Sequence, residues 1–221
     1  MSTINIAIDG PAGAGKSTIA KMVSARLGYI YVDTGALYRT VALYITENNI
    51  PDEDVEKSLE NADVSLRFVD GAQRVFLGDR DVSDLIRTPE ISMAASRTSA
   101  IPAVRAYLFE TQQKIAHENN ILMDGRDIGT VVLPNADVKI FLTASAEERA
   151  NRRYKELAEK PECPSYEDIL KDIIQRDYQD MHREIAPLKQ ADDAVLVDTT
   201  KLSLDESAEA IVNVIKEKLG K

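Results

Sequence analysis

Residues 10–17 carry a sequence pattern that is typical of loops that bind the phosphates of a nucleoside triphosphate. They fit G-x-x-x-x-G-K-[ST] in full, with a strand expected before them and a helix after them. Glycines let backbone N–H groups approach phosphate oxygens, Lys16 would place a positive charge on the β- and γ-phosphates, and Ser17 offers a hydroxyl to Mg²⁺. The triphosphate site is therefore expected at Gly10, Pro11, Ala12, Gly13, Ala14, Gly15, Lys16, Ser17 and Thr18.

Three further polar segments could supply the acceptor side of a transfer reaction. They cover residues 33–39, 124–130 and 149–153, and each follows the carboxyl end of a predicted strand. Ligands of an open parallel sheet bind in the crevice at those strand ends. We therefore expect these segments to converge on the phosphate loop, although they are far apart in the sequence.

Several of these residues have two interpretations. Arg149, Arg152 and Arg153 either bind phosphate or form a solvated helix face with ion pairs to nearby glutamates. Asp124 either caps the turn after its strand or lies near Mg²⁺, through a water molecule, and the second role is favoured. Tyr38 either packs in the core or lines the acceptor pocket.

The elements that must position these residues alternate along the chain. Short apolar runs predict strands at 4–8, 29–32, 121–123, 138–142 and 194–198, and helical spacing predicts helices at 16–27 and 36–47. Capping boxes predict further helices after Ser145 and Ser203, and a second helical arm is expected at 166–181. Near-continuous apolar strands separated by helices indicate an α/β fold, with a parallel five-stranded sheet flanked by helices.

Residues 63–87 interrupt this alternation. Two β-rich runs, 64–69 and 74–77, flank an Asp-Gly turn and predict an antiparallel hairpin, with a third short strand near Asp81 and Val82. We expect a small β insert and acceptor-binding region over 63–96 and a short helical lid over 155–188. Both are expected within a single domain that spans residues 1–221.

Composition limits the partners. The chain has 221 residues and a formal net charge of −10, which argues against nucleic acid or an anionic membrane as partner but leaves room for a small anionic substrate bound by clustered arginines. Cys163 has no second cysteine to pair with, and the N-terminus lacks a signal peptide pattern. A cytoplasmic location is expected, and the lack of an obvious interface stripe favours a monomer.

Taken together, the motifs resemble those of the bacterial cytidylate kinases, within the nucleoside monophosphate kinase family. The similarity runs from Ile8 to the C-terminus, and its strings are IDGPAGAGKST, DTGALYR, DVSDLIRTPEI, AASR, PAVR, DGRDIGTVVLP, EERANRR and HREIAPL. The resemblance implies a P-loop kinase that uses ATP with Mg²⁺ to phosphorylate CMP or dCMP. Gln179 and Met181 stand where some members have arginine, which makes the arm less basic.

The resemblance also implies roles for individual residues. The acceptor nucleotide would be bound by Thr34, Arg39, Ser96, Arg105, Arg126, Asp127 and Asp180. Within this set, Asp127 can accept hydrogen bonds from the cytosine N4 amino group, and arginines suit phosphate oxygens. The catalytic residues would be Lys16, Arg126, Arg152, Arg176 and Arg183, and the metal would lie at Ser17 and, through water, at Asp124.

Other functions remain possible at this stage. The same core could phosphorylate another small acceptor, such as UMP, shikimate or a sugar acid. A nucleotide-gated regulatory module with slow hydrolysis is the alternative from a different class. A GTP switch protein is less favoured, because the sequence lacks the Asn-Lys-x-Asp string that reads guanine.

Overall fold

The computed structural model of the chain describes residues 3–69, 72–158 and 163–220. The chain divides into two compact units. The first comprises residues 1–30 and 120–221, and the second comprises residues 31–119. The phosphate loop and segments 124–130 and 149–153 therefore belong to the first unit, and segment 33–39 belongs to the second. The prediction of a single domain with an insert over 63–96 and a lid over 155–188 stays a prediction.

The main sheet has five strands in the order β2-β6-β1-β7-β8. The strands are β1 (Asn5–Asp9), β2 (Ile30–Asp33), β6 (Ile121–Gly125), β7 (Val138–Thr143) and β8 (Val195–Asp198). Each predicted strand is confirmed to within a residue or two of its bounds. β1 pairs in parallel with β6 and β7, and β7 with β8. Because Ile6, Ile8, Leu122 and Ile140 are fully or almost fully buried, the sheet forms the core of the first unit.

Parallel register places functional residues at one edge of this sheet. Ile8 on β1 lies opposite Asp124 on β6, and Asp9 lies opposite Gly125. The phosphate loop leaves β1 directly after Asp9, so it starts beside the segment that begins at Asp124. The segments that leave β1 and β6 therefore lie side by side within the first unit.

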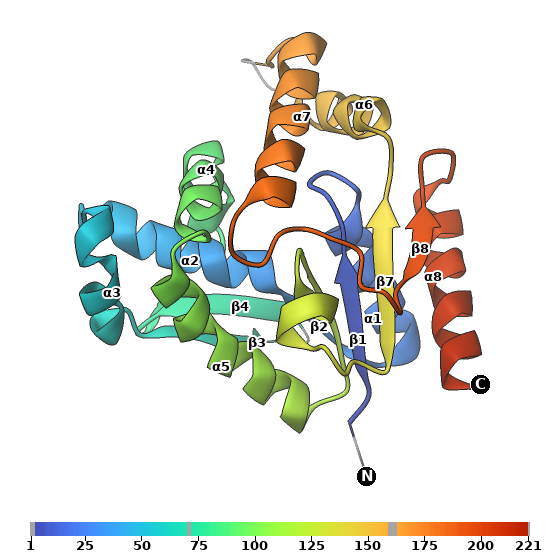
Figure 1. Cartoon of the computed structure of the whole chain (residues 1–221), viewed down its shortest axis with the longest axis horizontal. Coiled ribbons are helices and arrows are strands. Elements are labelled where there is room, and N and C mark those ends of the chain that lie inside the picture. The colour runs from blue at the N-terminus through green and yellow to red at the C-terminus, as the bar shows by residue number, and fades with distance from the viewer. Residues whose placement is uncertain (1–2, 70–71, 159–162, 221) are drawn as a thin grey trace. The chain divides into compact units, whose positions relative to one another are not determined.

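Four helices complete the described part of the first unit: α1 (Lys16–Leu27), α6 (Ala146–Leu157), α7 (Tyr166–His182) and α8 (Leu204–Leu219). α1 packs against α8, and α6 packs against α7 (Figure 1). The capping box at Ser203 is confirmed, with both of its hydrogen bonds present. The box at Ser145 is half formed: Ser145 caps the Glu148 N–H, but the Glu148 carboxylate accepts from Arg152 instead.

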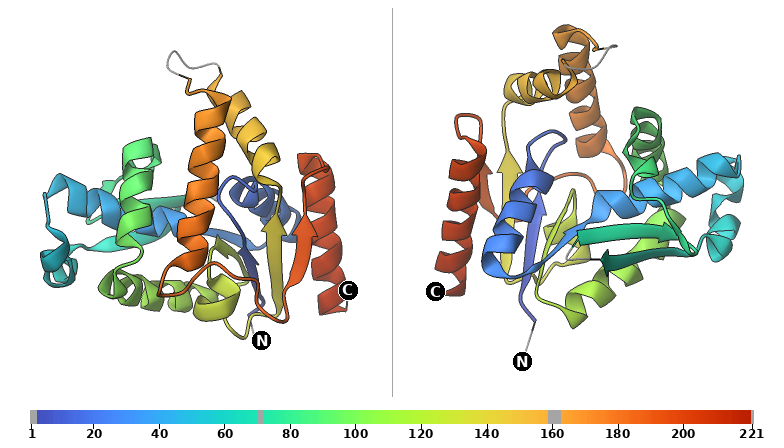
Figure 2. Two further views of the ribbon diagram at one scale, coloured as in Figure 1. Left: turned by 45° about the horizontal axis from the view of Figure 1, so that its top comes forward. Right: turned by 180° about the vertical axis from the view of Figure 1, so that it is seen from behind.

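The second unit is built around α2 (Thr34–Glu47). Helices α3 (Val55–Ser58), α4 (Pro89–Thr98) and α5 (Pro102–Glu118) follow it in the chain. A three-stranded antiparallel sheet of β3 (Val64–Val69), β4 (Ala72–Leu77) and β5 (Arg80–Asp81) packs on α2 (Figure 2). The predicted hairpin and third strand are thus confirmed, while the Asp-Gly turn at 70–71 lies outside the described residues.

A separate hydrophobic core holds the second unit together. Leu37 and Val41 of α2, Val75 of β4 and Leu108 of α5 are among its buried members. Val104, Leu108, Gln112 and Ala116 give α5 a buried stripe at four-residue spacing. That spacing was the signal for α5, a helix that the sequence analysis did not predict.

No helix in the described residues is long and apolar enough to cross a lipid bilayer.

The start of the phosphate loop tolerates no side chain. Gly10 has φ of 151°, and a Cβ there would overlap the backbone carbonyl oxygen of Leu142 on β7. Gly10→Ala is therefore expected to lower the free energy of unfolding by about 3 kcal/mol or more. Gly28→Ala is the matched control, because Gly28 also has positive φ (69°) but nothing within 4 Å of its Cβ position. It should cost about 1 kcal/mol. Equal losses of the two variants in urea denaturation would contradict this account.

Candidate active site

The side chain of Lys16 folds back onto the phosphate loop. Lys16 is buried, and its Nζ donates to the carbonyl oxygens of Gly10 at 2.8 Å and Pro11 at 2.7 Å. Gly13 and Gly15 have φ of 75° and 84°, left-handed values that other residues rarely adopt. Gly15 is also the N-cap of α1, so the positive end of that helix dipole lies at the loop. Left-handed glycines and a helix N-terminus are features that suit a loop for binding anions.

Burial lowers the pKa of Lys16, and nearby charges shift it in both directions. Burial and the positive charge of Arg126 lower its pKa to about 7, and the carboxylates of Asp124, Asp9 and Asp180 oppose that shift. A polyanion that binds beside a buried ammonium group stabilises its protonated form and so raises its pKa. Bound phosphates would add negative charge and hold Lys16 protonated.

Ser17 and Asp124 come together as predicted. The Ser17 hydroxyl donates to Asp124 Oδ2 at 2.9 Å, and Asp124 is buried. Mg²⁺ in nucleotide sites takes one or two protein oxygens and completes its shell with phosphates and water. A hydroxyl and a carboxylate at the mouth of the loop fit that requirement.

Asp9 is a site residue that the sequence analysis missed. Its buried carboxylate accepts from the backbone N–H groups of Ile128 at 2.8 Å and Gly129 at 2.7 Å, at the start of a short π-helical segment, Ile128–Val132. Desolvation dominates and raises the pKa of Asp9 to about 6, although both hydrogen bonds favour its ionised form. Asp9 thereby fixes the backbone just after Arg126 and Asp127. The signal was its position, since it ends the strand that leads into the phosphate loop.

Two ion pairs join residues of the first unit that are predicted to take part in binding and catalysis. Arg126 Nε donates to Asp180 Oδ2 at 2.8 Å, and Arg183 Nη2 lies 3.6 Å from Asp127 Oδ1. Asp127 and Asp180 are both buried. The structure thus brings β6, the end of α7 and the segment that follows it together around these charges. Arg183 thus lies beside the carboxylate that is expected to read the base.

The arginines of α6 differ from one another. Arg153 is exposed and pairs with Glu156, as a solvated helix face requires. Arg152 makes the expected pair with Glu148 and also donates to the Thr199 carbonyl at 2.7 Å.

The solvated-face interpretation is wrong for Arg149, which is buried and bonded to the Asp177 carboxylate. Arg176 lies next to Asp177 on α7 and is half-buried.

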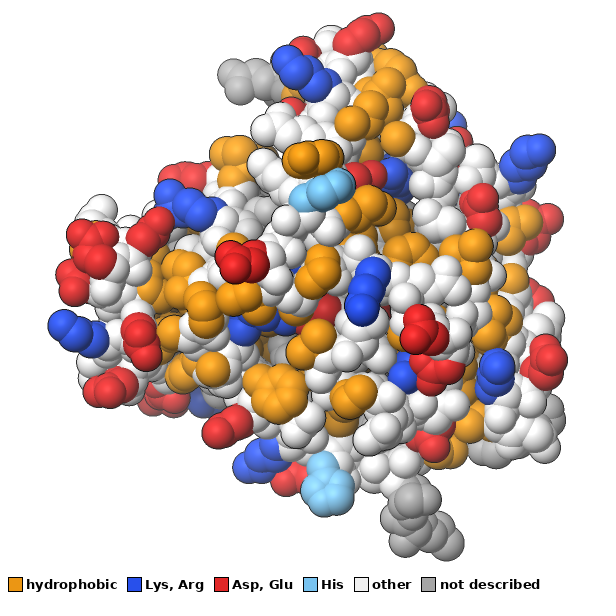
Figure 3. Space-filling view, viewed as in Figure 1, with side chains coloured by type: hydrophobic (Ala, Val, Ile, Leu, Met, Phe, Trp, Pro, Cys, Tyr) orange, Lys and Arg blue, Asp and Glu red, His pale blue; other side chains and the backbone are white. Residues whose placement is uncertain are grey.

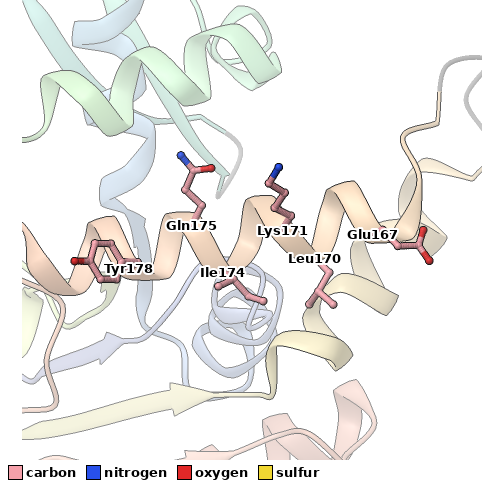
Figure 4. Close-up of a pocket in the computed structure, with 6 residues that line it drawn as sticks. All are labelled: Glu167, Leu170, Lys171, Ile174, Gln175 and Tyr178. Atoms are coloured by element: carbon pink, nitrogen blue, oxygen red, sulfur yellow. The ribbon is translucent and has the colours of Figure 1, made fainter.

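α7 presents a second face that takes no part in these contacts. Glu167, Leu170, Lys171, Ile174, Gln175 and Tyr178 line a groove there (Figure 4). Ile174 and Tyr178 are exposed apolar side chains. Elsewhere on the face seen in Figure 3, acidic and basic side chains are interspersed.

The second unit holds the other predicted acceptor residues. Thr34 is buried at the first turn of α2, whose N-cap is Asp33. Arg39 pairs with Asp33 at 2.9 Å. The Arg105 guanidinium of α5 lies 5.8 Å from the centre of the Tyr38 ring, which itself packs against the core of this unit.

Ser96 is half-buried on α4. α4 and α5 both pack against α2, so the structure gathers these predicted residues on neighbouring elements of one unit.

Comparison with known proteins decides the family. A model of the cytidylate kinase family matches residues 6–217. The chain belongs to the cytidylate kinase family. It is 49% identical to a cytidylate kinase of Carboxydothermus hydrogenoformans, over 97% of this chain and 98% of the relative. It is 51% identical to that of Caldicellulosiruptor bescii (97% and 96%) and 52% identical to that of Ligilactobacillus salivarius (97% and 97%).

Solved structures give the fold of this cytidylate kinase family member independently. A shikimate kinase from Bacteroides thetaiotaomicron matches with a TM-score of 0.52 and 15% identity, over 99% of each chain. An uncharacterised protein from Eubacterium ventriosum matches with a TM-score of 0.57 and 12% identity, over 97% of this chain and 99% of the other. At these identities the likeness shows a P-loop kinase fold and says nothing of the acceptor.

The depressed pKa of Lys16 makes ATP binding pH-dependent. Because its pKa is about 7 in the free protein and bound phosphates raise it, the complex holds more protons than free protein and ATP do at pH 8. ATP affinity should therefore fall, by up to about tenfold per pH unit, as pH rises above 7. Calorimetry at pH 8 in buffers of different ionisation enthalpy should show proton uptake. Lys16→Met should abolish it, and an unaltered protein that takes up no proton would contradict the account.

Proposed function

We propose that this cytidylate kinase family member transfers the γ-phosphoryl group of ATP to CMP or dCMP, giving ADP and CDP or dCDP. The match to the family over residues 6–217 is the observation that supports the proposal most strongly. The contact between Ser17 and Asp124 beside the buried Lys16 supports a triphosphate site in the same fold. We further propose that it acts in the cytoplasm as a monomer, with small nucleotides as partners and without nucleic acid or membrane.

The reaction needs charge more than it needs a base. The second pKa of a phosphate monoester is about 6, so the acceptor phosphate of CMP is already mostly dianionic at neutral pH. In-line attack on the γ-phosphorus then depends on positioning and on neutralising charge in a loose transition state. Lys16, Arg126, Arg152, Arg176 and Arg183 are the residues that we propose for this role.

Mg²⁺ would be held by Ser17 and, through water, by Asp124. When bound, it neutralises phosphate charge that repels the acceptor. The carboxylate of Asp124 already accepts a hydrogen bond from the Ser17 hydroxyl, so both oxygens face the same point at the loop mouth. Residues 10–18 would bind the ATP phosphates.

We propose that the acceptor nucleotide is bound by the residues that the family resemblance implied for it. Thr34, Arg39 and Arg126 would hold the phosphate of CMP, while Ser96, Arg105 and Asp127 would contact cytosine and Asp180 the ribose. An ionised Asp127 accepts from the cytosine N4 amino group and repels the carbonyl that uracil has at that position. Asp127 pairs with Arg183 in this structure, and contacts to cytosine would replace that ion pair.

Two rivals would use the same triphosphate site. One is a kinase of another small acceptor, such as UMP, shikimate or a sugar acid. The other is an ATP-gated regulatory module with slow hydrolysis. The family match favours neither, and the likeness to shikimate kinase concerns the fold alone.

An acceptor panel tests the proposed function. ADP release should depend on an acceptor and should be fastest with CMP and dCMP among CMP, dCMP, UMP, AMP, shikimate and gluconate. Lys16→Met should lower turnover by at least about a hundredfold, since it removes the charge at the β- and γ-phosphates. Its circular dichroism should match that of the unaltered protein. ATP hydrolysis that ignores the acceptor would favour the regulatory module.

Asp127→Asn should relax base selection. The amide keeps the shape of the carboxylate but can donate to the uracil carbonyl, so kcat/KM for CMP should fall about tenfold to a hundredfold while that for UMP falls less. Asp205→Asn is the control, because Asp205 is exposed and pairs with Arg26 of α1. An unchanged ratio of CMP to UMP in Asp127→Asn would remove the proposed base-reading role from this residue.

A further inference from the structure

Arg149 connects three segments of the first unit through one buried guanidinium group. Its Nε donates to the Ala144 carbonyl after β7, and its Nη1 donates to the Ala12 carbonyl of the phosphate loop, each at 2.9 Å. Nη1 and Nη2 both bond the Asp177 carboxylate of α7. The side chain of Arg149 is 5% exposed and that of Asp177 is 15% exposed, so solvent screens this pair little.

The contact with Ala12 affects how the phosphate loop presents its donors. In a trans peptide the carbonyl and the following N–H point in opposite directions. Arg149 draws the Ala12 carbonyl toward itself, and the Gly13 N–H therefore points away from Arg149. The stem of Arg149 also packs under the loop, since a Cβ on Gly13 would lie 3.5 Å from the Arg149 Cβ. Arg149 thus supports the loop from outside the phosphate cradle.

The contact with Asp177 affects α7. Asp177 follows Arg176 directly and precedes Asp180 by three residues, which is about one helical turn. Asp180 in turn accepts from Arg126. Any shift of Asp177 along or about the helix axis would move Arg176 and Asp180 with it. The Arg149–Asp177 pair therefore fixes where these two residues stand relative to the phosphate loop.

We propose that Arg149 and Asp177 form a positioning pair that couples the phosphate loop to α7 during phosphoryl transfer. Neither residue needs to touch a nucleotide for this role. The planar fork of arginine, with donors on three sides, is what lets one side chain hold the loop and the helix together. The inference rests on the proposed kinase function, because it concerns the placement of Arg176 in that reaction.

The contacts of Arg149 and Asp177 do not by themselves distinguish a positioning pair from a purely structural ion pair. The experiment must therefore separate effects on stability from effects on turnover. Asp177→Asn leaves the buried guanidinium without a full counter-charge and is expected to lower both thermal stability and kcat. The double variant Arg149→Met/Asp177→Leu removes both charges and fills the space with apolar groups, which often restores stability. It lacks the fork, however, and should keep a low kcat.

Three expected results define the proposal. In Asp177→Asn, kcat should fall about tenfold to a hundredfold with the KM for CMP changed less than threefold, since displaced catalytic groups lose rate more than substrate affinity. Asp177→Glu should recover part of the loss, because it restores the charge. The double variant should regain most of the Tm that Asp177→Asn loses, because it leaves no unpaired buried charge, but it should not regain kcat. Full recovery of both in the double variant would overturn the proposal.

A matched ion pair on the same helix serves as the control. Arg153 and Glu156 pair on the exposed side of α6, and Arg153→Gln/Glu156→Gln should leave kcat and Tm nearly unchanged. Hydrogen exchange of the α7 amides gives a readout that needs no activity. It should accelerate in Asp177→Asn and in the double variant, and unchanged exchange in both would also overturn the coupling. If the unaltered protein phosphorylates no CMP, the proposed function fails whatever the exchange shows.

Discussion

The parallel pairing of β1 with β6 is the constraint on which the first unit depends. It sets Ile8 opposite Asp124 and Asp9 opposite Gly125, so the loop that leaves β1 and the segment that leaves β6 start side by side. Ser17 can then reach Asp124, and the Asp9 carboxylate can hold the backbone of Ile128 and Gly129. A slip of one residue in this register would turn these side chains to opposite faces of the sheet and separate them.

Charged side chains gather at the same edge of the sheet, and several of them contact other groups of the protein. Lys16 bonds two backbone carbonyls of its own loop, Arg126 pairs with Asp180, and Arg183 pairs with Asp127. These three cations, all proposed to meet phosphate, therefore contact oxygen atoms of the protein. Burying unpaired charges is costly, and these contacts offset that cost. A phosphate that binds there would have to replace these protein contacts, which lowers the net affinity. A ligand that offers an acceptor to each of these cations would be favoured over one that does not.

The sequence predicted the parts of the fold that are written in local patterns. Hydrophobic runs located the strands, helical spacing and Gly28 bounded α1, and the Walker-type glycines identified the phosphate loop. It missed α5, whose buried positions recur at four-residue spacing between polar neighbours. It also missed Asp9 and Asp177 as site residues, because each acts through a partner more than 25 residues away, 119 for Ile128 and 28 for Arg149. Such partners are set by packing and leave no short motif.

Arg149 shows why spacing alone misled for the arginine-rich helix. Arg149 and Arg153 are four residues apart and so lie on similar sides of α6, yet one is buried and the other exposed. Arg149 reaches Asp177 of α7 and the Ala12 carbonyl of the phosphate loop, whereas Arg153 pairs with Glu156 of its own helix. An ion pair at helical spacing is worth little when solvated, whereas a buried arginine must find a partner for every donor. Burial cannot be read directly from the sequence. It decides which arginine of α6 contacts both the phosphate loop and α7.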